Sequence, residues 1–152
     1  MLKFRELGTY KTAHNNGYCT CASVLKNGYG VTANEATKIA SLPTADTAKE
    51  DVWIVLNRID KPETHQPNDY VIEIGEYPRL FRVRSLDGRI IDMDMDAVTT
   101  AYADVAVGDK LTFGTDGKLV ETADVTGYST YFEVTEKTTF GGEGLAVKVV
   151  VV

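Results

Sequence analysis

One segment near the C-terminal end constrains the fold more than any other, because residues 107–121 have the pattern of a compact β-hairpin. Asp116-Gly117 supplies the two residues that tolerate positive φ in a two-residue type I′ turn. This turn would place Phe113 opposite Val120, with apolar pairs on one side of the hairpin and polar pairs on the other. The hairpin therefore predicts a β-fold, and it carries no chemistry of its own.

A valine-rich strand follows this hairpin. Leu145–Val152 ends in four consecutive valines, which would be an aggregation hazard as an exposed edge. We therefore expect this strand to be covered, either in the centre of the protein's own sheet or at an interface with another subunit. The chain of 152 residues is long enough for one hydrophobic core and too short for two full domains.

The composition changes near residue 50. Residues 1–50 are rich in Thr, Ala, Asn and Gly, and we expect an N-terminal arm or appendage in which Thr32–Glu35, with the spacing of a capping box, begins a helix that Pro43 ends. Residues 51–152 predict a β-rich body, and Val52–Leu56 is typical of a strand buried on both faces. The predicted fold class is mainly β: a small β-barrel or sandwich body with an extended, partly helical N-terminal region.

A second hairpin is predicted around Asp87-Gly88. A simple two-residue turn would mix charged and apolar side chains on both faces of this hairpin. A turn lengthened by one residue, or one that contains a bulge, pairs Arg84 with Asp92 and Arg82 with Asp94. We therefore predict the longer turn and one charged face of paired Arg and Asp.

Two further motifs could suggest a metal. Asp92–Asp96 begins like a calcium-binding loop, but Ala97 and Ala103 stand where that loop needs a glycine and a bidentate glutamate. Cys19 and Cys21 are the only cysteines, and two thiolates fall short of a zinc site without partners. We predict no metal and no cofactor, and we interpret both thiols as ordinary reduced strand residues.

The remaining sequence features argue against an enzyme. His14 and His65 are the only histidines and neither lies in a recognisable motif, nor does the chain contain a nucleophile elbow or a phosphate-binding glycine loop. Residues 51–152 carry ten Lys and Arg against eighteen Asp and Glu, an acidic excess that disfavours nucleic acid. Without an apolar run long enough for a membrane span, and without a secretion signal, we expect a protein made and kept in a cytoplasm or in something assembled there.

Four segments, Val105–Leu111, Asp116–Val120, Tyr131–Val134 and Leu145–Val150, together resemble the small capsid cement or decoration proteins of tailed bacteriophages. Those proteins tend to show a V-G-D-x-L … D-G-K-L hairpin, then a variable strand, then a terminal V-x-V-x-V strand in a small β-barrel. The resemblance covers about the last fifty residues. It implies a non-enzymatic virion structural protein that binds the outside of the capsid and stabilises it. Its partners would be the major capsid protein and neighbouring copies of itself, and it would be assembled in the host cytoplasm.

Two alternatives remain open from the sequence. One is another phage structural role, such as a head fibre base, a tail protein or a connector. The other is a cellular β-barrel that binds a small molecule or a sugar, for which eight tyrosines and Trp53 offer weak support. For the capsid role we expect contacts in the first fifty residues and in the loop from Pro62 to Pro67. The expected contact residues are Phe4, Arg5, Tyr10, His14, Pro62, His65 and Pro67.

Overall fold

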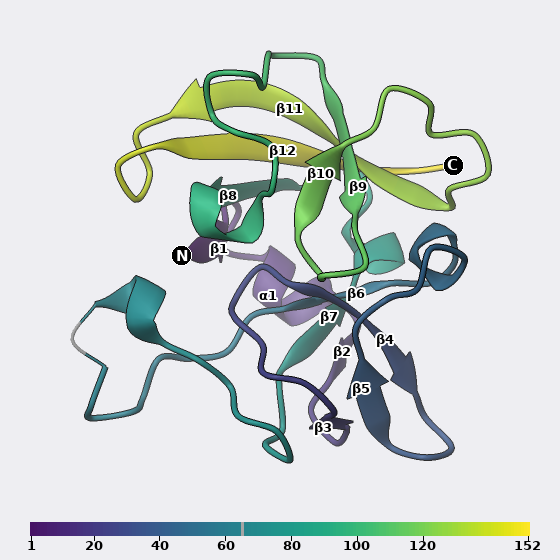
Figure 1. Ribbon diagram of the computed structural model, residues 1–152, viewed down its shortest axis with the longest axis vertical. Coiled ribbons are helices and arrows are strands. Elements are labelled where there is room, and N and C mark those ends of the chain that lie inside the picture. Colours follow the sequence, from purple (N-terminus) through teal and green to yellow (C-terminus); the bar gives the residue numbers. More distant parts are fainter. Residues whose placement is uncertain (65) are drawn as a thin grey trace.

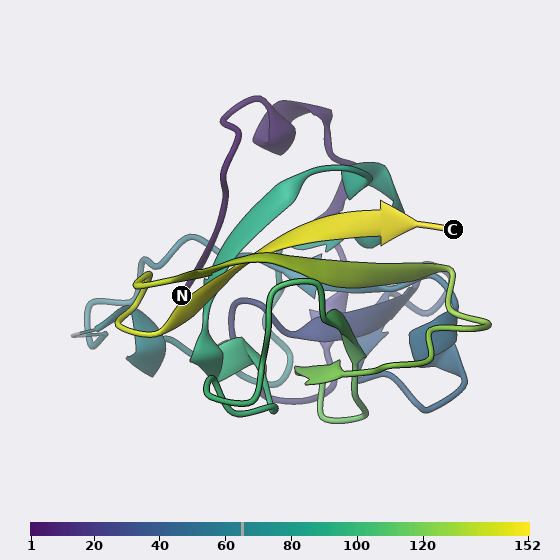
Figure 2. The same cartoon turned by 90° about the horizontal axis from the view of Figure 1, so that it is seen from above.

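The computed structural model describes residues 1–64 and 66–152, and within these ranges the strands form two six-stranded sheets that pack against each other (Figure 1). The C-terminal sheet is antiparallel throughout. In spatial order its strands are β1 (Leu2–Phe4), β8 (Ile90–Asp94), β12 (Gly144–Val151), β11 (Thr130–Thr138), β9 (Lys110–Phe113) and β10 (Leu119–Glu121). Figure 2 shows β8, β12 and β11 side by side from above.

The N-terminal sheet lies below the C-terminal sheet in Figure 1 and is antiparallel apart from its β3–β5 pair. In spatial order its strands are β2 (Asn15–Asn16), β7 (Leu80–Arg82), β6 (Trp53–Val55), β4 (Gly30–Asn34), β5 (Ile39–Ser41) and β3 (Thr20–Cys21). Helix is confined to short turns in the described ranges: α1 (Thr9–Thr12) and the 3-10 turns Thr47–Lys49, Pro67–Asp69, Val83–Leu86 and Met95–Ala97.

Two apolar clusters lie on opposite faces of the N-terminal sheet. Ile54 and Phe81 face the C-terminal sheet and join its buried side chains in an inner core. Trp53 and Val55 alternate with Ile54 along β6, so they point to the other face, where they join an outer core. Segments 17–26 and 70–77 contribute to this outer core through side chains such as Ile72.

Several expectations from the sequence are confirmed. The described residues are mainly β. Residues Val52–Leu56 contain β6, whose three residues are buried on both faces of the sheet. The valine-rich C-terminal strand, β12, pairs on one side with β8 and on the other with β11, which covers both of its edges. The strands of the described residues close no barrel.

The expected extended, partly helical N-terminal region is not present. One four-residue α-helix lies in residues 1–50, and Thr32–Glu35, where a longer helix was expected to begin, instead forms the end of β4 and the turn into β5. Asn34 Oδ1 accepts hydrogen bonds from the backbone N–H groups of Ala36 and Thr37 at 3.0 and 3.1 Å, so the side chain stabilises a hairpin turn. Residues 1–50 supply strands to both sheets rather than lying outside them.

The hairpin predicted around Asp87-Gly88 is wrong, because β7 and β8 belong to different sheets. The 3-10 turn Val83–Leu86 carries the chain from one sheet to the other, and it buries Val83 and Leu86 in the inner core. Two of the side chains that were expected to pair, Arg82 and Asp92, therefore have other partners. Arg82 pairs with Asp51, and Asp92 pairs with Arg5.

The 107–121 hairpin forms, but its register differs by one residue from the predicted one. Leu119, rather than Val120, lies opposite Phe113. The loop is longer than a type I′ turn: Gly117 N–H donates to Gly114 O at 3.0 Å, and Gly117 has φ +80°. The longer loop directs Phe113 and Leu119 together into the inner core, which the predicted register would not do.

Candidate interaction surface

The outer face of the N-terminal sheet is covered along only part of its length. Arg82 lies beside Trp53 in the β6–β7 pairing, and its backbone N–H donates to His14 O at 2.8 Å. His14 directly precedes β2, so the register places the side chains of His14, Arg82 and Trp53 next to one another. Segments 17–26 and 70–77 cover the neighbouring part of this face, and their apolar side chains share the outer core with Trp53 but not with His14 or Arg82.

Where the cover stops, the surface is hollowed. This polar hollow has a volume of about 630 Å³ and is open to solvent. Trp53 lies at its base with 4% of its surface exposed. The ring of His14 meets the Trp53 indole edge to face, with centroids 5.3 Å apart and planes inclined by 67°. The full lining is His14, Thr32, Ala33, Asn34, Glu35, Asp51, Trp53 and Arg82.

The backbone and side chains around the polar hollow are fixed by hydrogen bonds. His14 N–H donates to Ser85 Oγ at 2.9 Å, which holds the imidazole-bearing segment against the 3-10 turn Val83–Leu86. Arg82 Nε donates to both carboxylate oxygens of Asp51, at 3.0 and 2.8 Å, and Arg82 Nη2 lies 2.6 Å from Asp51 Oδ2. These hydrogen bonds, together with the negative charges of Asp51 and Glu35, raise the pKa of Arg82 above its ordinary value. The site is thus preformed, with one ion pair already satisfied.

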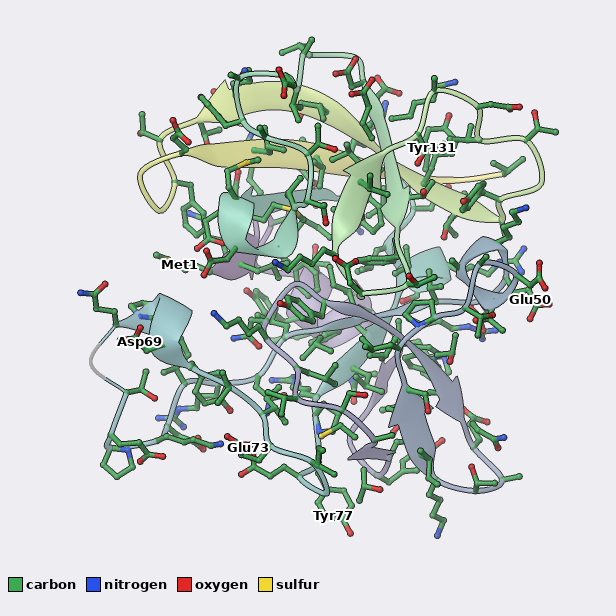
Figure 3. All side chains as sticks on the ribbon, in the orientation of Figure 1. Met1, Glu50, Asp69, Glu73, Tyr77 and Tyr131 are labelled. Atoms are coloured by element: carbon green, nitrogen blue, oxygen red, sulfur yellow. The ribbon has the colours of Figure 1, made fainter. Side chains whose placement is uncertain are left out.

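Large apolar side chains remain exposed to solvent on three segments that hydrogen bonds connect. We call them the apolar rim, and they are Tyr18, Val24, Ile39, Ile74 and Tyr77. In Figure 3, Tyr77 points away from the body at the end opposite the C-terminal sheet, with Glu73 on the same segment.

The backbone under the apolar rim is tied together by hydrogen bonds. Cys21 N–H donates to Glu76 O at 3.0 Å and Gly75 N–H to Cys21 O at 2.9 Å, while Thr20 N–H donates to Lys38 O at 3.0 Å. Hydrogen bonds therefore hold the segments that carry these side chains in place, although the side chains themselves are exposed. An exposed apolar group on a rigid support is typical of a surface that binds another protein.

The hollow and the rim meet at one side chain pair. Desolvation, and then the nearby Glu35 carboxylate that lines the polar hollow, raise the pKa of the Tyr18 hydroxyl. The apolar rim and the polar hollow therefore adjoin at Tyr18.

Of the contact residues predicted from the sequence, His14 lies in this surface. Phe4 does not, which corrects the prediction: it is buried in the inner core on β1, with its ring 5.0 Å from that of Phe81. Arg5 lies on the outer side of the C-terminal sheet, where it pairs with the buried Asp92 at 2.6 Å. Tyr10 packs against Phe4 and its hydroxyl accepts a hydrogen bond from the Phe4 N–H at 3.2 Å.

The other predicted contact residues belong to the loop between β6 and β7. Pro62 and Pro67 are exposed there, and His65 lies outside the described residues. This loop is fastened by Lys61, whose Nζ donates to Val71 O at 2.7 Å and to Glu76 Oε2 at 2.8 Å. The structure therefore does not bring the prolines together with His14 in one hollow.

Sequence reasoning missed the other residues that line the polar hollow. From the sequence, Trp53 is expected only as part of a strand buried on both faces, and Thr32–Glu35 as the start of a helix. Asp51, Trp53 and Arg82 come together only through the pairing of β6 with β7, for which the local sequence holds no signal. Asp51 and Trp53 are two residues apart, so an extended chain places them on the same side of the strand. This spacing is the one clue in the sequence to the polar hollow.

The two cysteines serve the outer core. Both thiols are free and buried; Cys21 Sγ donates to Glu73 O at 2.8 Å, and the Asn16 side-chain amide donates to Cys19 Sγ at 3.3 Å. Burial raises the pKa of the Cys21 thiol. Over the described part of the chain, no group of three or more His, Cys, Asp or Glu side chains is arranged to hold a metal ion.

None of the helices in residues 1–64 and 66–152 has the length and apolar character that crossing a lipid bilayer requires. Comparison with protein-family models, with curated proteins and with solved structures finds no match to this chain.

Proposed function

We propose that this chain is a non-enzymatic structural protein of a bacteriophage virion, which binds the outside of the capsid and stabilises it. The observation that carries the binding role is the apolar rim, because five large side chains stay exposed on segments that hydrogen bonds tie together. The capsid context comes from the resemblance of the last fifty residues to decoration proteins. The major capsid protein would be the partner of this surface.

The character of the apolar rim fits a docking role. Ile74 and Tyr77 expose 66% and 63% of their surface. A protein partner that covered both side chains would gain about 25 cal/mol for each Å² of apolar area removed from water. Tyrosine is among the residues that contribute most to protein interfaces, since its ring offers area and its hydroxyl a hydrogen bond. Many copies on a repeating shell would add such contacts together.

The direct test is sedimentation with phage capsid shells that lack this protein. The purified protein is expected to pellet with the shells at a fixed ratio to capsid subunits. Ile74→Asp and Tyr77→Asp should each lower the bound fraction at least about tenfold, since a carboxylate in an apolar interface must be desolvated. Val107→Asp is the matched control, because Val107 is 63% exposed but lies outside the apolar rim.

Wild-type protein that stays in the supernatant would overturn the capsid proposal. Equal loss of binding in Val107→Asp would overturn the assignment of the surface. The small-ligand alternative is favoured by one observation, the polar hollow with its tryptophan base. It predicts a low-molecular-weight polar ligand and no sedimentation with shells.

A further inference from the structure

The polar hollow has an unbalanced set of charges. Two carboxylates, Asp51 and Glu35, line it together with one guanidinium, that of Arg82. Asp51 and Arg82 neutralise each other through three short contacts of 2.6 to 3.0 Å. Glu35 is left as the charge that a ligand in the hollow would meet, and its residue is exposed. A cation is therefore favoured over an anion in this space.

The other lining groups suit a cationic side chain. The exposed ring of His14, which meets the buried Trp53 indole edge to face, offers π surface in the hollow that Glu35 also lines. Aromatic faces attract ammonium and guanidinium groups, and a carboxylate adds a charge-assisted hydrogen bond. A volume of about 630 Å³ has room for the end of one long side chain and for the water around it.

We propose that the binding partner inserts a cationic side chain, an arginine or a lysine, into the polar hollow. This inference rests on the proposed function, because it names the chemistry of the partner that the apolar rim would dock. The rim supplies the buried area, and the inserted cation fixes the position of the partner along the sheet. The net charge of −6 on the chain also favours a basic partner face.

Trp53 makes this inference testable without the partner, since it is the only tryptophan of the chain and lies at the base of the hollow. The experiment follows its indole N–H signal by NMR during titration with four probes of equal salt content. Nα-acetyl-arginine amide and Nα-acetyl-lysine amide carry the cation. Nα-acetyl-citrulline amide is the neutral isostere of arginine, and methyl glucoside represents a polar sugar. A pH of about 8 keeps imidazole groups in general largely uncharged.

We expect a saturable shift of the Trp53 signal with one or both cationic probes, at least about fivefold weaker binding of citrulline, and no shift with the glucoside. Arginine and lysine are distinguished by their separate titrations. Equal shifts with citrulline, a shift with the glucoside alone, or no shift with either cation would each overturn the inference.

The charge dependence is tested by Glu35→Gln, which should weaken binding of the cationic probe at least about threefold. Glu143→Gln is the matched control, because Glu143 is also exposed, lies outside the hollow between β11 and β12, and changes the net charge equally. Equal affinity in the two variants would contradict the role of Glu35.

The two proposals can fail separately. If the protein binds to shells but not to the cationic probes, the inserted cationic side chain is overturned and the capsid role stands. If the protein binds the cationic probes but not the shells, the capsid role is overturned and the hollow remains a site that binds cations.

Discussion

Gly30 is a residue at which the two sheets approach each other closely. Its N–H donates to Gly117 O at 2.6 Å, which joins β4 of one sheet to the β9–β10 loop of the other. A Cβ atom built on Gly30 would fall against the ring of Phe113, itself buried in the inner core. Only glycine fits between this ring and the strand. The sheet spacing therefore depends on the absence of one side chain.

We predict that Gly30→Ala lowers the free energy of unfolding by at least about 2 kcal/mol, because the ring of Phe113 or the strand must shift to admit a methyl group. Gly17→Ala is the control, since an added Cβ there meets nothing within 4 Å and the residue does not have positive φ. Its stability should change by less than about 0.5 kcal/mol. Urea unfolding of the three proteins measures both values, and equal midpoints for the two variants would contradict the packing argument.

Lys137 is a second residue on which distant segments depend. Its Nζ donates to Tyr102 O at 2.6 Å and to Val105 O at 2.8 Å, and lies 4.2 Å from the centroid of the Tyr102 ring. A single ammonium group on β11 thus holds the loop that leads into β9.

Replacing this ammonium group tests its role. Lys137→Met should cost about 1 to 2 kcal/mol of stability, because two carbonyl groups lose a charged donor. Lys148→Met on β12, where the side chain makes none of these contacts, should be close to neutral. Thermal unfolding measures the difference, and hydrogen exchange should rise in residues 101–106 of Lys137→Met alone. Unchanged exchange in that loop would contradict the assignment.

At the scale of elements, the sequence predicted strands better than it predicted their partners. The apolar runs of β6 and β12 identified buried strands, because only a covered position tolerates such composition. The two Asp-Gly turns were misleading, since the same dipeptide fits loops of different length and also fits a turn between sheets. Asp87-Gly88 joins strands of separate sheets, and Asp116-Gly117 lies in a longer loop.

The candidate surface was still harder to anticipate. His14 was among the expected contacts, whereas Trp53 and Arg82 were not, because long-range register alone places these three side chains together. Register between strands whose paired residues are 25 or more positions apart is decided by the packing of the inner core, at positions such as Ile54 and Phe81. A local pattern of charge and hydropathy cannot supply it.

The loop between β6 and β7 offers a prediction about pH. Glu76 Oε2 accepts hydrogen bonds from Lys61 Nζ at 2.8 Å and from the Glu73 N–H at 2.6 Å. These bonds, with that of Lys61 the larger cause, lower the pKa of Glu76, and the same pair raises the pKa of Lys61. Because the pKa of Glu76 is lower in the folded loop than its ordinary value, the ionised carboxylate stabilises the folded loop when the pH is above that ordinary value. This stabilisation is lost as the pH falls through the lowered pKa. The raised pKa of Lys61 acts in the opposite direction, and its contribution is lost only as the pH rises through that raised value in alkali.

We therefore expect the loop to loosen in acid before the sheets unfold. Hydrogen exchange of the Glu73 amide, corrected for its intrinsic rate, should speed up as Glu76 is protonated, while amides of β12 keep their protection. In Glu76→Gln the Glu73 amide should exchange quickly at every pH in this range. Protection of Glu73 that is independent of pH in the wild type would contradict the role of the ion pair.

At the scale of the whole molecule, the first fifty residues are bound into both sheets. They contribute β1 to the C-terminal sheet and four strands to the N-terminal sheet. Phe4 enters the inner core and Val31 the outer core. The Ser129 N–H donates to Lys49 O at 2.8 Å, so the connector before β6 is also attached to the C-terminal half. Removing residues 1–50 would leave β6 and β7 as a pair without strand neighbours, and it would take Leu25 and Val31 out of the outer core that contains Trp53.

We predict that residues 51–152 expressed alone do not reach the native fold, because a two-stranded remnant is marginal in water and the inner core loses part of its cover. The full chain should show dispersed amide NMR signals and cooperative urea unfolding, and the fragment should show neither. Mixing the fragment with a peptide of residues 1–50 should restore part of the dispersion, since the missing strands can pair with exposed edges. A fragment that is dispersed and unfolds cooperatively by itself would mean that residues 1–50 are an appendage on a self-sufficient body. The polar hollow would then be a feature of the docked arm, because His14 and Glu35 belong to those fifty residues whereas Trp53 and Arg82 do not.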